Sequence, residues 1–241
     1  MTKEELRAGM ETELAWRQEE LAFFKNQLTN IDDELKKDKY RKSLVLMLYS
    51  HFEGFIKICL LSYVQYINSL KLERYKFNEK LIASSMEGEF NAYDNNAQKC
   101  KIFKGKVLDD SRLHKFHRRV NLLYGMENMK QGVLNIPDQT IDTESNLWYI
   151  VLQKNLYRVG LSINLFDDLS NDIDALVNRR NSIAHGSERA GVTESEYSKW
   201  EGKAYKIMEH ITKYIYKDVC HENYLKDTVL ENKLQDIEVN S

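Results

Sequence analysis

Hydrophobic residues recur at helical spacing through most of the chain, beginning near the N-terminus. Between residues 3 and 35 they keep a four-three rhythm that is broken by Arg17. Thr2 stands before this pattern and Glu5 follows three residues later, which is the spacing of a capping box. The pattern predicts a long amphipathic helix packed on one neighbour, with a coiled coil as the alternative. The apolar residues of the rhythm are Met10, Leu14, Leu21, Phe24, Leu28, Ile31 and Leu35.

Residues 40–70 are apolar almost all round, after a polar break within residues 29–39. Such a stretch is typical of a helix buried at the centre of a protein, but it is also long enough to cross a membrane. A membrane-spanning helix would carry His51, Glu53 and Lys57 near its middle, where a charge costs roughly 2.5–3.5 kcal/mol. We therefore predict a central buried helix and no contact with a membrane.

Two further helices are indicated in the C-terminal half. Thr143 is expected to N-cap a helix that ends at Gly160. Thr193 and Glu196 have the spacing of a second capping box, and the helix that they begin should continue to about Asp218. Its apolar residues repeat at helical spacing, which favours core positions over a surface for stacking nucleic-acid bases. These residues are Tyr197, Trp200, Ala204, Ile207, Ile211, Tyr214 and Ile215.

The hydrophobic signal weakens in residues 71–140, and the tail after about residue 220 is polar and expected to fray. The densest group of basic residues lies in this middle region. It could bind phosphate, or it could form a solvated helix face and loop, as closely spaced like charges usually do. His114 and His117 lack further ligands at zinc-site spacing, so no metal site is predicted. The basic residues are Lys99, Lys101, Lys104, Lys106, Arg112, His114, Lys115, His117, Arg118 and Arg119.

Residues 170–186 carry the strongest helix signals of the chain. Ser170, or an aspartate before it, can N-cap this helix, and Gly186 suits a left-handed position after its end. On a helical wheel, Arg180 falls in the middle of the apolar arc, where a leucine would be expected. The apolar residues of that arc are Ile173, Leu176, Val177, Ile183 and Ala184.

Arg180 on a packing face requires a partner, because burying an unpaired charge costs several kcal/mol. A carboxylate, a cluster of carbonyl groups or a bound anion would meet this requirement. Asn181 and His185 are four residues apart and flank Arg180, so a cation, an amide and an imidazole converge on one surface. Glu53 is a second ionisable group in an apolar setting, and we expect it to compensate a cation, directly or through Lys57. Whether Glu53 is structural or takes part in chemistry stays open.

Composition agrees with a mainly helical protein of 241 residues, since the chain has one proline and 30% charged residues. We expect a single domain over residues 1–241. The formal net charge of −2 means that any nucleic-acid site must be a local patch. Cys59, Cys100 and Cys220 are dispersed and without metal-site spacing, which favours reduced thiols. Together with a charged N-terminal segment, this indicates a cytoplasmic protein.

The sequence also resembles a known family. Arg180, Asn181 and His185 form an Arg-Asn-x-x-x-His motif that closes a helix, which is similar to the signature of HEPN domains. Residues 15–20 and 49–57 resemble the first two helices of stand-alone bacterial HEPN-like nucleases, and residues 143–147 add a further match. The resemblance implies an all-α, up-and-down helical bundle of the HEPN type, with a long N-terminal helix pair and an irregular middle region.

By this resemblance, the protein is expected to be a metal-independent endoribonuclease, acting as a toxin or a phage-defence effector without any cofactor. Arg180 and His185 would be catalytic together with Asn181. Supporting roles fall to Glu53, Lys57 and Arg179, the basic residue before the motif arginine. The expected partners are an RNA substrate and an antitoxin or regulatory protein.

A homodimer is expected because RNA cleavage by internal transfer needs both a base and an acid, whereas the motif supplies one imidazole per chain. The competing hypothesis is that His51, His114 or His117 supplies the second group within one chain.

The alternative function is a catalytically silent helical module that binds a nucleotidyltransferase or a regulator. Some HEPN toxins carry a tyrosine two residues after the motif histidine, where a partner adenylylates it, but this chain has Ser187 there. Others carry an acidic residue where Ala175 stands. Asp174 or Glu53 could substitute for that residue, which leaves the activation of the site open.

Overall fold

The computed structural model describes residues 1–103, 110–187 and 189–226, and within these ranges it contains eight α-helices, four 3-10 helices and no strand. The predicted all-α class is confirmed. The chain forms two compact units, one of residues 1–69 with 138–222 and one of residues 70–137 with the chain from residue 223 onward. The single domain that the sequence predicted over residues 1–241 stays a prediction. The first unit contains α1 (Lys3–Asn26), η1 (Gln27–Asn30), α2 (Glu34–Ser69), η3 (Asp138–Thr140), α6 (Tyr149–Arg158), η4 (Asp167–Leu169), α7 (Ser170–Ala184) and α8 (Glu194–Cys220).

Both predicted capping boxes are present. The Thr2 hydroxyl accepts from the Glu5 N–H at 3.0 Å, and the Glu5 carboxylate accepts from the Thr2 N–H at 2.7 Å. The same reciprocal bonds join Thr193 and Glu196 at the start of α8. Each box satisfies backbone donors that a helix N-terminus leaves unpaired, so these two helices begin where the sequence predicted.

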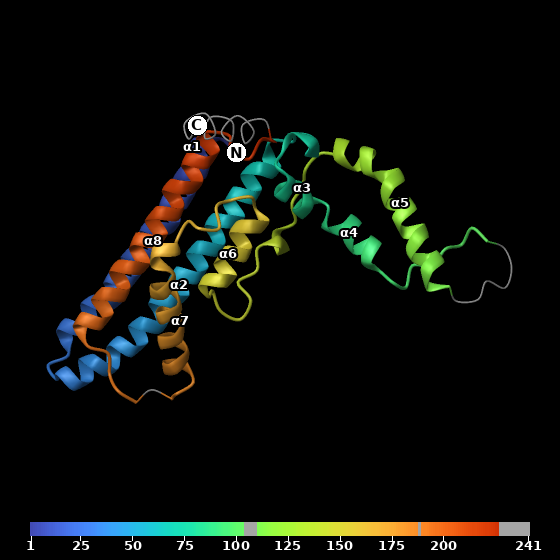
Figure 1. The fold of residues 1–241 in the computed structure, drawn as a ribbon. Coiled ribbons are helices and arrows are strands. Elements are labelled where there is room, and N and C mark those ends of the chain that lie inside the picture. The colour runs from blue at the N-terminus through green and yellow to red at the C-terminus, as the bar shows by residue number, and fades with distance from the viewer. Residues whose placement is uncertain (104–109, 188, 227–241) are drawn as a thin grey trace, which may run out of the picture. The chain divides into compact units, whose positions relative to one another are not determined.

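In the first unit, helices α1, α2, α7 and α8 run alternately up and down (Figure 1). Lys3 at the start of α1 pairs with Glu222 just beyond α8, and Lys25 near the end of α1 pairs with Glu201, so α1 and α8 are antiparallel. Residues 27–33 connect α1 to α2, and the two helices are also antiparallel. Ion pairing of Lys203 with Asp172 and stacking of Arg179 on Trp200 place α7 antiparallel to α8.

The core of this unit is built around α2, as the continuous apolar run predicted. Helix α2 packs against α1, α7 and α8 and has buried residues over most of its circumference, with Ser50 and Lys57 exposed on the remaining side. It is long and apolar enough to cross a membrane by length and composition, but 56% of its most apolar window is already buried within the protein. The core helix of a soluble protein meets the same criteria, so this finding is weak evidence for a membrane. Cys59 in α2 is buried, and all three cysteines are free thiols.

Two predicted N-caps are wrong, although α7 begins at the predicted residue. Helix α6 begins at Tyr149 with Trp148 at the N-cap position, whereas Thr143 is buried in the preceding loop. Helix α7 begins at Ser170, but the Ser170 hydroxyl donates to the Asp167 carbonyl at 2.8 Å and caps no N–H group. The 3-10 turn η4 leads directly into α7, so the first turn of α7 needs no side-chain cap. The ends were predicted correctly, because Gly160 and Gly186 adopt φ values of 77° and 71°.

The second unit contains η2 (Arg74–Lys76), α3 (Glu79–Ser85), α4 (Glu87–Asp94) and α5 (Ser111–Gln131). This middle region is therefore more helical than its weak periodicity indicated. Arg74 holds it together, since its guanidinium pairs with Glu89 at 2.8 Å and donates to the carbonyls of Ser85 and Met129. Lys104 and Lys106 of the basic region lie outside the described residues, as does the tail from residue 227 onward.

Candidate functional site

Arg180 lies half-buried in α7, two turns beyond the buried Ile173 and one turn beyond the buried Val177. Its Nη1 donates to the side-chain oxygen of Asn146 at 2.9 Å and to that of Asn181 at 2.8 Å. No carboxylate of the described residues lies within 4.0 Å of the guanidinium. Because both polar partners are neutral, the positive charge of Arg180 remains available to attract an anion.

The aromatic face of Tyr49, on α2, covers the other side of this cation. The guanidinium carbon of Arg180 lies 4.9 Å from the centre of the Tyr49 ring, within the range of a cation–π contact. The Tyr49 hydroxyl accepts from the Leu147 N–H at 2.8 Å and donates to the Glu53 carboxylate. Burial, reinforced by the bond to Glu53, raises the pKa of Tyr49, so the phenol stays protonated.

Replacing Tyr49 by phenylalanine is expected to lower the free energy of unfolding by about 1–3 kcal/mol, because the buried Leu147 N–H would lose its acceptor. The ring beneath Arg180 would remain. Urea denaturation would measure the loss. The matched change Tyr124→Phe removes a hydroxyl from a side chain that is 82% exposed and should cost little. Equal stability of Tyr49→Phe and the wild type would contradict the assigned hydrogen bond.

The expected direct pairing of Glu53 with Arg180 is not formed. Glu53 is half-buried and bonded to the Tyr49 hydroxyl, and among the described residues it forms no ion pair with Arg180. Lys57 is exposed, and among the described residues neither Glu53 nor Arg180 forms an ion pair with it. Glu53 thus orients the aromatic support of Arg180 without neutralising its charge, and Lys57 lies outside this cluster.

Asp174 is also engaged elsewhere. Its carboxylate accepts from the Tyr149 N–H at 2.8 Å, at the first residue of α6. This bond joins α7 to the start of α6, and the bond from Leu147 to Tyr49 joins the same segment to α2. The two bonds fix the loop that presents Asn146 to Arg180.

His185 occupies the C-cap position of α7, where its N–H donates to the Asn181 carbonyl at 2.9 Å. Its side chain is exposed, and its ring forms no hydrogen bond with any residue that the structure describes. Gly186 then turns the chain away with a positive φ. The helix end therefore presents an accessible imidazole one turn beyond the amide that contacts Arg180.

Arg179 faces a different neighbour. Its Nη2 donates to the Gly191 carbonyl at 3.2 Å, and its guanidinium carbon lies 5.8 Å from the centre of the Trp200 ring on α8. A Cβ at Gly191 would stand 2.4 Å from the Cβ of Asp38, so only glycine permits this close approach of the loop to α2. Arg179 is thereby placed to hold the loop that follows the motif.

His51 lies on the side of α2 that faces α1. Its Nε2 is 3.0 Å from the Glu20 carboxylate, and its ring meets the Trp16 ring edge-on at 5.4 Å between centres. Residues 49 and 51 point in roughly opposite directions on a helix at about 100° per residue. The structure therefore groups His51 with α1, and Tyr49 and Arg180 with each other. His114 and His117 belong to the second unit.

The free energy of unfolding should fall as pH drops below the ordinary histidine pKa of 6.5, partly through His51. Burial lowers the pKa of His51, with a further contribution from Arg17, against the opposing effect of Glu20. The unfolded chain then binds more protons than the native one between the two pKa values, so stability is full above 6.5 and decreases below it. His51→Gln should flatten the dependence of Tm on pH between about pH 7 and pH 5. An unchanged slope would show that His51 does not contribute.

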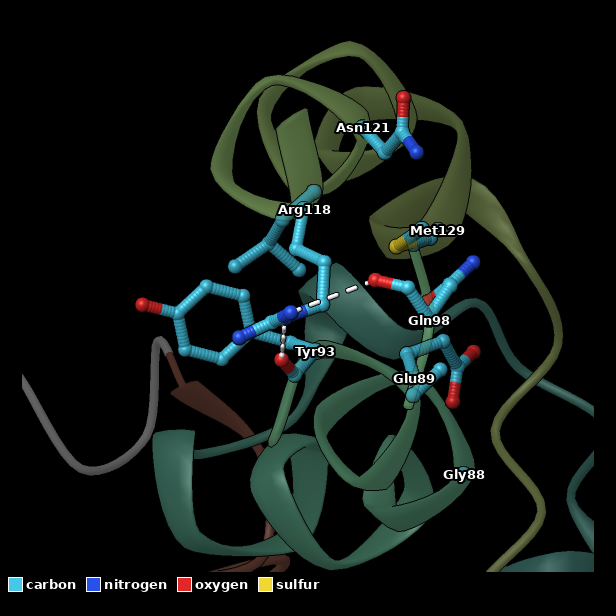
Figure 2. A pocket seen from close by; sticks show the side chains of 9 residues that line it. Gly88, Glu89, Tyr93, Gln98, Arg118, Asn121 and Met129 are labelled. Atoms are coloured by element: carbon cyan, nitrogen blue, oxygen red, sulfur yellow. Dashed lines mark hydrogen bonds between the residues drawn. The ribbon is translucent and has the colours of Figure 1, made fainter. Parts of the chain in front are cut away.

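A separate hollow of about 450 Å³ lies in the second unit between α4 and α5. Figure 2 shows Arg118 reaching into it from α5. The guanidinium donates to the Tyr93 carbonyl at 2.8 Å, to the Gln98 carbonyl at 3.3 Å and to the Asn96 side chain at 2.8 Å, and Glu89 in the same hollow pairs with Arg74. These charged groups are already used to hold the fold, so the candidate catalytic site remains at α7.

The structure thus brings together Arg180 and Asn181 with Asn146 and Tyr49, two residues that the sequence did not identify as part of the site. Asn146 lies in the stretch 143–147 that carries part of the family resemblance, which is the only signal that pointed to it. In residues 1–103, 110–187 and 189–226, no group of three or more His, Cys, Asp or Glu side chains is arranged to hold a metal ion.

Comparisons with known proteins support the family resemblance. Searches of curated proteins and of solved structures return no match to this chain. A family model described as RiboL-PSP-HEPN matches residues 12–217, a range that includes α2, α7, the greater part of α1 and nearly all of α8. The chain therefore belongs to this HEPN family, which associates it with nuclease or RNA-related roles at the family level.

Proposed function

We propose that the protein is an endoribonuclease whose catalytic residues are Arg180, Asn181 and His185. The observation that carries the proposal is a half-buried cation held by neutral groups and an aromatic face, at a helix end that also exposes an imidazole. An uncompensated guanidinium is suited to bind a phosphate, since arginine donors match phosphate oxygens. The imidazole titrates near neutral pH and can therefore transfer protons.

The proposed reaction is an internal transfer within RNA. A general base removes the proton of a ribose 2′-hydroxyl, and the 2′-oxygen attacks the adjacent phosphorus. The bond from phosphorus to the 5′-oxygen breaks, and that oxygen takes up a proton from a general acid. The products are a 2′,3′-cyclic phosphate and a 5′-hydroxyl, so no water is consumed. Arg180 stabilises the charge that develops on the non-bridging oxygens.

Each residue has a distinct role in this proposal. His185 acts as the acid or base, and Asn181 orients Arg180 through the 2.8 Å bond between them. Asn146 and Tyr49 hold the guanidinium from the other sides, Glu53 orients Tyr49, and Arg179 holds the following loop. Lys57 takes no part. All steps use side chains, so the reaction is proposed to be independent of metals and cofactors.

The biological setting is part of the proposal. We infer a cytoplasmic homodimer that cleaves RNA as a toxin or phage-defence effector and is controlled by an antitoxin or another regulatory partner. A dimer would supply two imidazoles, one as base and one as acid, whereas one chain supplies a single motif histidine. His51 is paired with Glu20 on the α1 side of α2, which favours the second chain as the source.

The decisive experiment is incubation of the purified protein with total cellular RNA, followed by mapping of both ends of the products. We expect 2′,3′-cyclic phosphate and 5′-hydroxyl ends. Products with 5′-phosphates would contradict internal transfer. Absence of any cleavage by a folded dimer, over a range of RNA and protein concentrations, would favour the second function below.

One observation favours a catalytically silent binding module instead. Asp174 and Glu53 are the two carboxylates that could have replaced the acidic residue missing at Ala175, but they are engaged with the Tyr149 N–H and the Tyr49 hydroxyl. No carboxylate of the described residues therefore activates Arg180. In this alternative, Arg180 would still be required for binding of an anionic partner, without cleavage of RNA.

A further inference from the structure

Helix α5 presents an outward stripe in which three cations and two apolar side chains share one face. Arg112, Lys115, Phe116, Arg119 and Leu123 share an arc about 100° wide when residues are placed at 100° intervals. All five are exposed, with Phe116 62% and Leu123 68% accessible to solvent. Tyr124 follows Leu123 in the chain, points about 80° beyond the edge of the stripe and is 82% exposed. We call the first five residues the α5 stripe.

The cations of the α5 stripe carry uncompensated charge. Among the described residues, the side chains of Arg112, Lys115 and Arg119 form no ion pair. Helix α5 has no acidic residue between Ser111 and Met126. The nearest carboxylates along the chain that are described are Asp110, which caps the α5 N-terminus through the N–H groups of Arg112 and Leu113, and Glu127.

Arg118 shows what a structural arginine of the same helix does. It points inward, is 6% exposed and donates to the carbonyls of Tyr93 and Gln98 (Figure 2). It also donates to the side-chain oxygen of Asn96. These bonds attach α5 to the last turn of α4 and the segment after it, and they fix the inward-facing side of α5. The three outward cations are therefore not needed for the fold of this unit.

A single-stranded nucleic acid fits this surface best. Its phosphates require cations at short intervals, and its unpaired bases gain stability by stacking on aromatic rings. A helix that lies on a membrane keeps its charges on one face and its apolar residues on the other. In the α5 stripe the two kinds share one arc about 100° wide, and Phe116 lies between Lys115 and Arg119 along the helix axis.

We propose that the α5 stripe, with Tyr124, is a binding site for single-stranded RNA that is distinct from the motif on α7. Arg112, Lys115 and Arg119 hold phosphates, and Phe116 stacks on a base. This inference rests on the proposed ribonuclease function, since it takes RNA as the ligand. It also gives a protein of net charge −2 a local patch with which to hold RNA.

The test measures binding rather than cleavage, in His185→Ala protein so that the RNA stays intact. The probe is a fluorescein-labelled, unstructured single-stranded RNA. Removing all three cations with Arg112→Ala, Lys115→Ala and Arg119→Ala should weaken binding at low salt by roughly tenfold or more, and should reduce the slope of log K against log salt by about 2. Lys199→Ala, Lys206→Ala and Lys217→Ala remove the same charge from α8 and are expected to change Kd little. Circular dichroism and Tm would verify folding.

Stacking is tested separately at Phe116. Phe116→Ala should weaken RNA binding by roughly 5- to 150-fold, and Phe116→Leu, which keeps an apolar side chain, should not restore it. Unchanged Kd in both the charge variant and Phe116→Ala would overturn the inference. A fall of the solution mass from dimer to monomer in Phe116→Ala would also overturn the inference. So would binding to phosphatidylserine–phosphatidylcholine vesicles that depends on the α5 stripe, if RNA binding does not depend on it.

The outcomes separate this inference from the proposed function. RNA binding that needs the α5 stripe, in a protein whose wild type cleaves no RNA, would support the inference and reject the ribonuclease. Cleavage that needs Arg180, with RNA binding unaffected by any change in the α5 stripe, would support the ribonuclease and reject the inference about the stripe.

Discussion

Replacing Arg180 by alanine is expected to lower the rate of RNA cleavage by about 10²–10³-fold, because it removes the donor that meets the developing charge on phosphate. His185→Ala should cause a loss of at least this size, since proton transfer by a positioned side chain contributes about 10²–10⁴-fold. Excess chelator should leave the wild-type rate unchanged, because the proposed steps use side chains alone.

The fold should survive the loss of Arg180. Its polar partners, Asn146 and Asn181, are neutral, so truncation leaves no buried carboxylate without a counter-charge. Helical content by circular dichroism should therefore be retained. Arg7→Ala removes an exposed guanidinium from a surface ion pair on α1 and is the matched control, with an unchanged rate expected. Full activity of either Arg180→Ala or His185→Ala would reject the proposed catalytic site.

Local signals in the sequence predicted the helix termini that depend on local bonds. The capping boxes at Thr2 and Thr193 and the glycine at 186 act within four residues of themselves, so their effect can be inferred from spacing alone. Ser170 and Thr143 have the same chemistry, but at these positions a 3-10 turn and a buried loop determine the conformation. A side chain that can cap a helix does so only where tertiary packing leaves the N-terminus open.

Partners from distant segments could not be predicted in the same way. The helical wheel placed Arg180 on an apolar face, and the requirement for a partner followed from the cost of a buried charge. One partner, Asn146, lies 34 residues earlier in the chain, and the other, Tyr49, lies on helix α2. Asn146 and Tyr49 hold the guanidinium in place of the expected Glu53, whose carboxylate bonds to the Tyr49 hydroxyl instead. Chain spacing carries no information on such contacts.

Helix α5 was missed for a different reason. Its inward face includes His114 and Arg118, and its outward face includes Phe116 and Leu123, so apolar and polar residues do not separate by side. Periodicity methods require that separation. The same mixture of polar and apolar residues that hides the helix in the sequence forms the α5 stripe, the proposed RNA-binding surface.

In mixtures of wild-type chains with His185→Ala chains, cleavage should fall more steeply than the fraction of wild-type chains. A two-fold axis beside Gly186 would place two copies of the motif around one phosphate groove, with one imidazole acting as base and the other as acid. If each groove requires both histidines, an equal mixture should retain about a quarter of the wild-type rate, against about half for independent sites. The exposed position of His185 at the end of α7 leaves it accessible to a second chain.

The experiment requires proof that subunits exchange, which mass measurement of mixed tagged and untagged chains would supply. His210→Ala chains are the matched control, because His210 is an exposed histidine on α8, in contact with Phe166 and outside the proposed site. Mixing them with wild-type chains should leave the rate unchanged. A proportional loss with His185→Ala chains despite verified exchange, or an active monomer, would eliminate the shared site. The acid and the base would then both have to come from one chain, so a second residue of that chain would have to act together with the exposed His185.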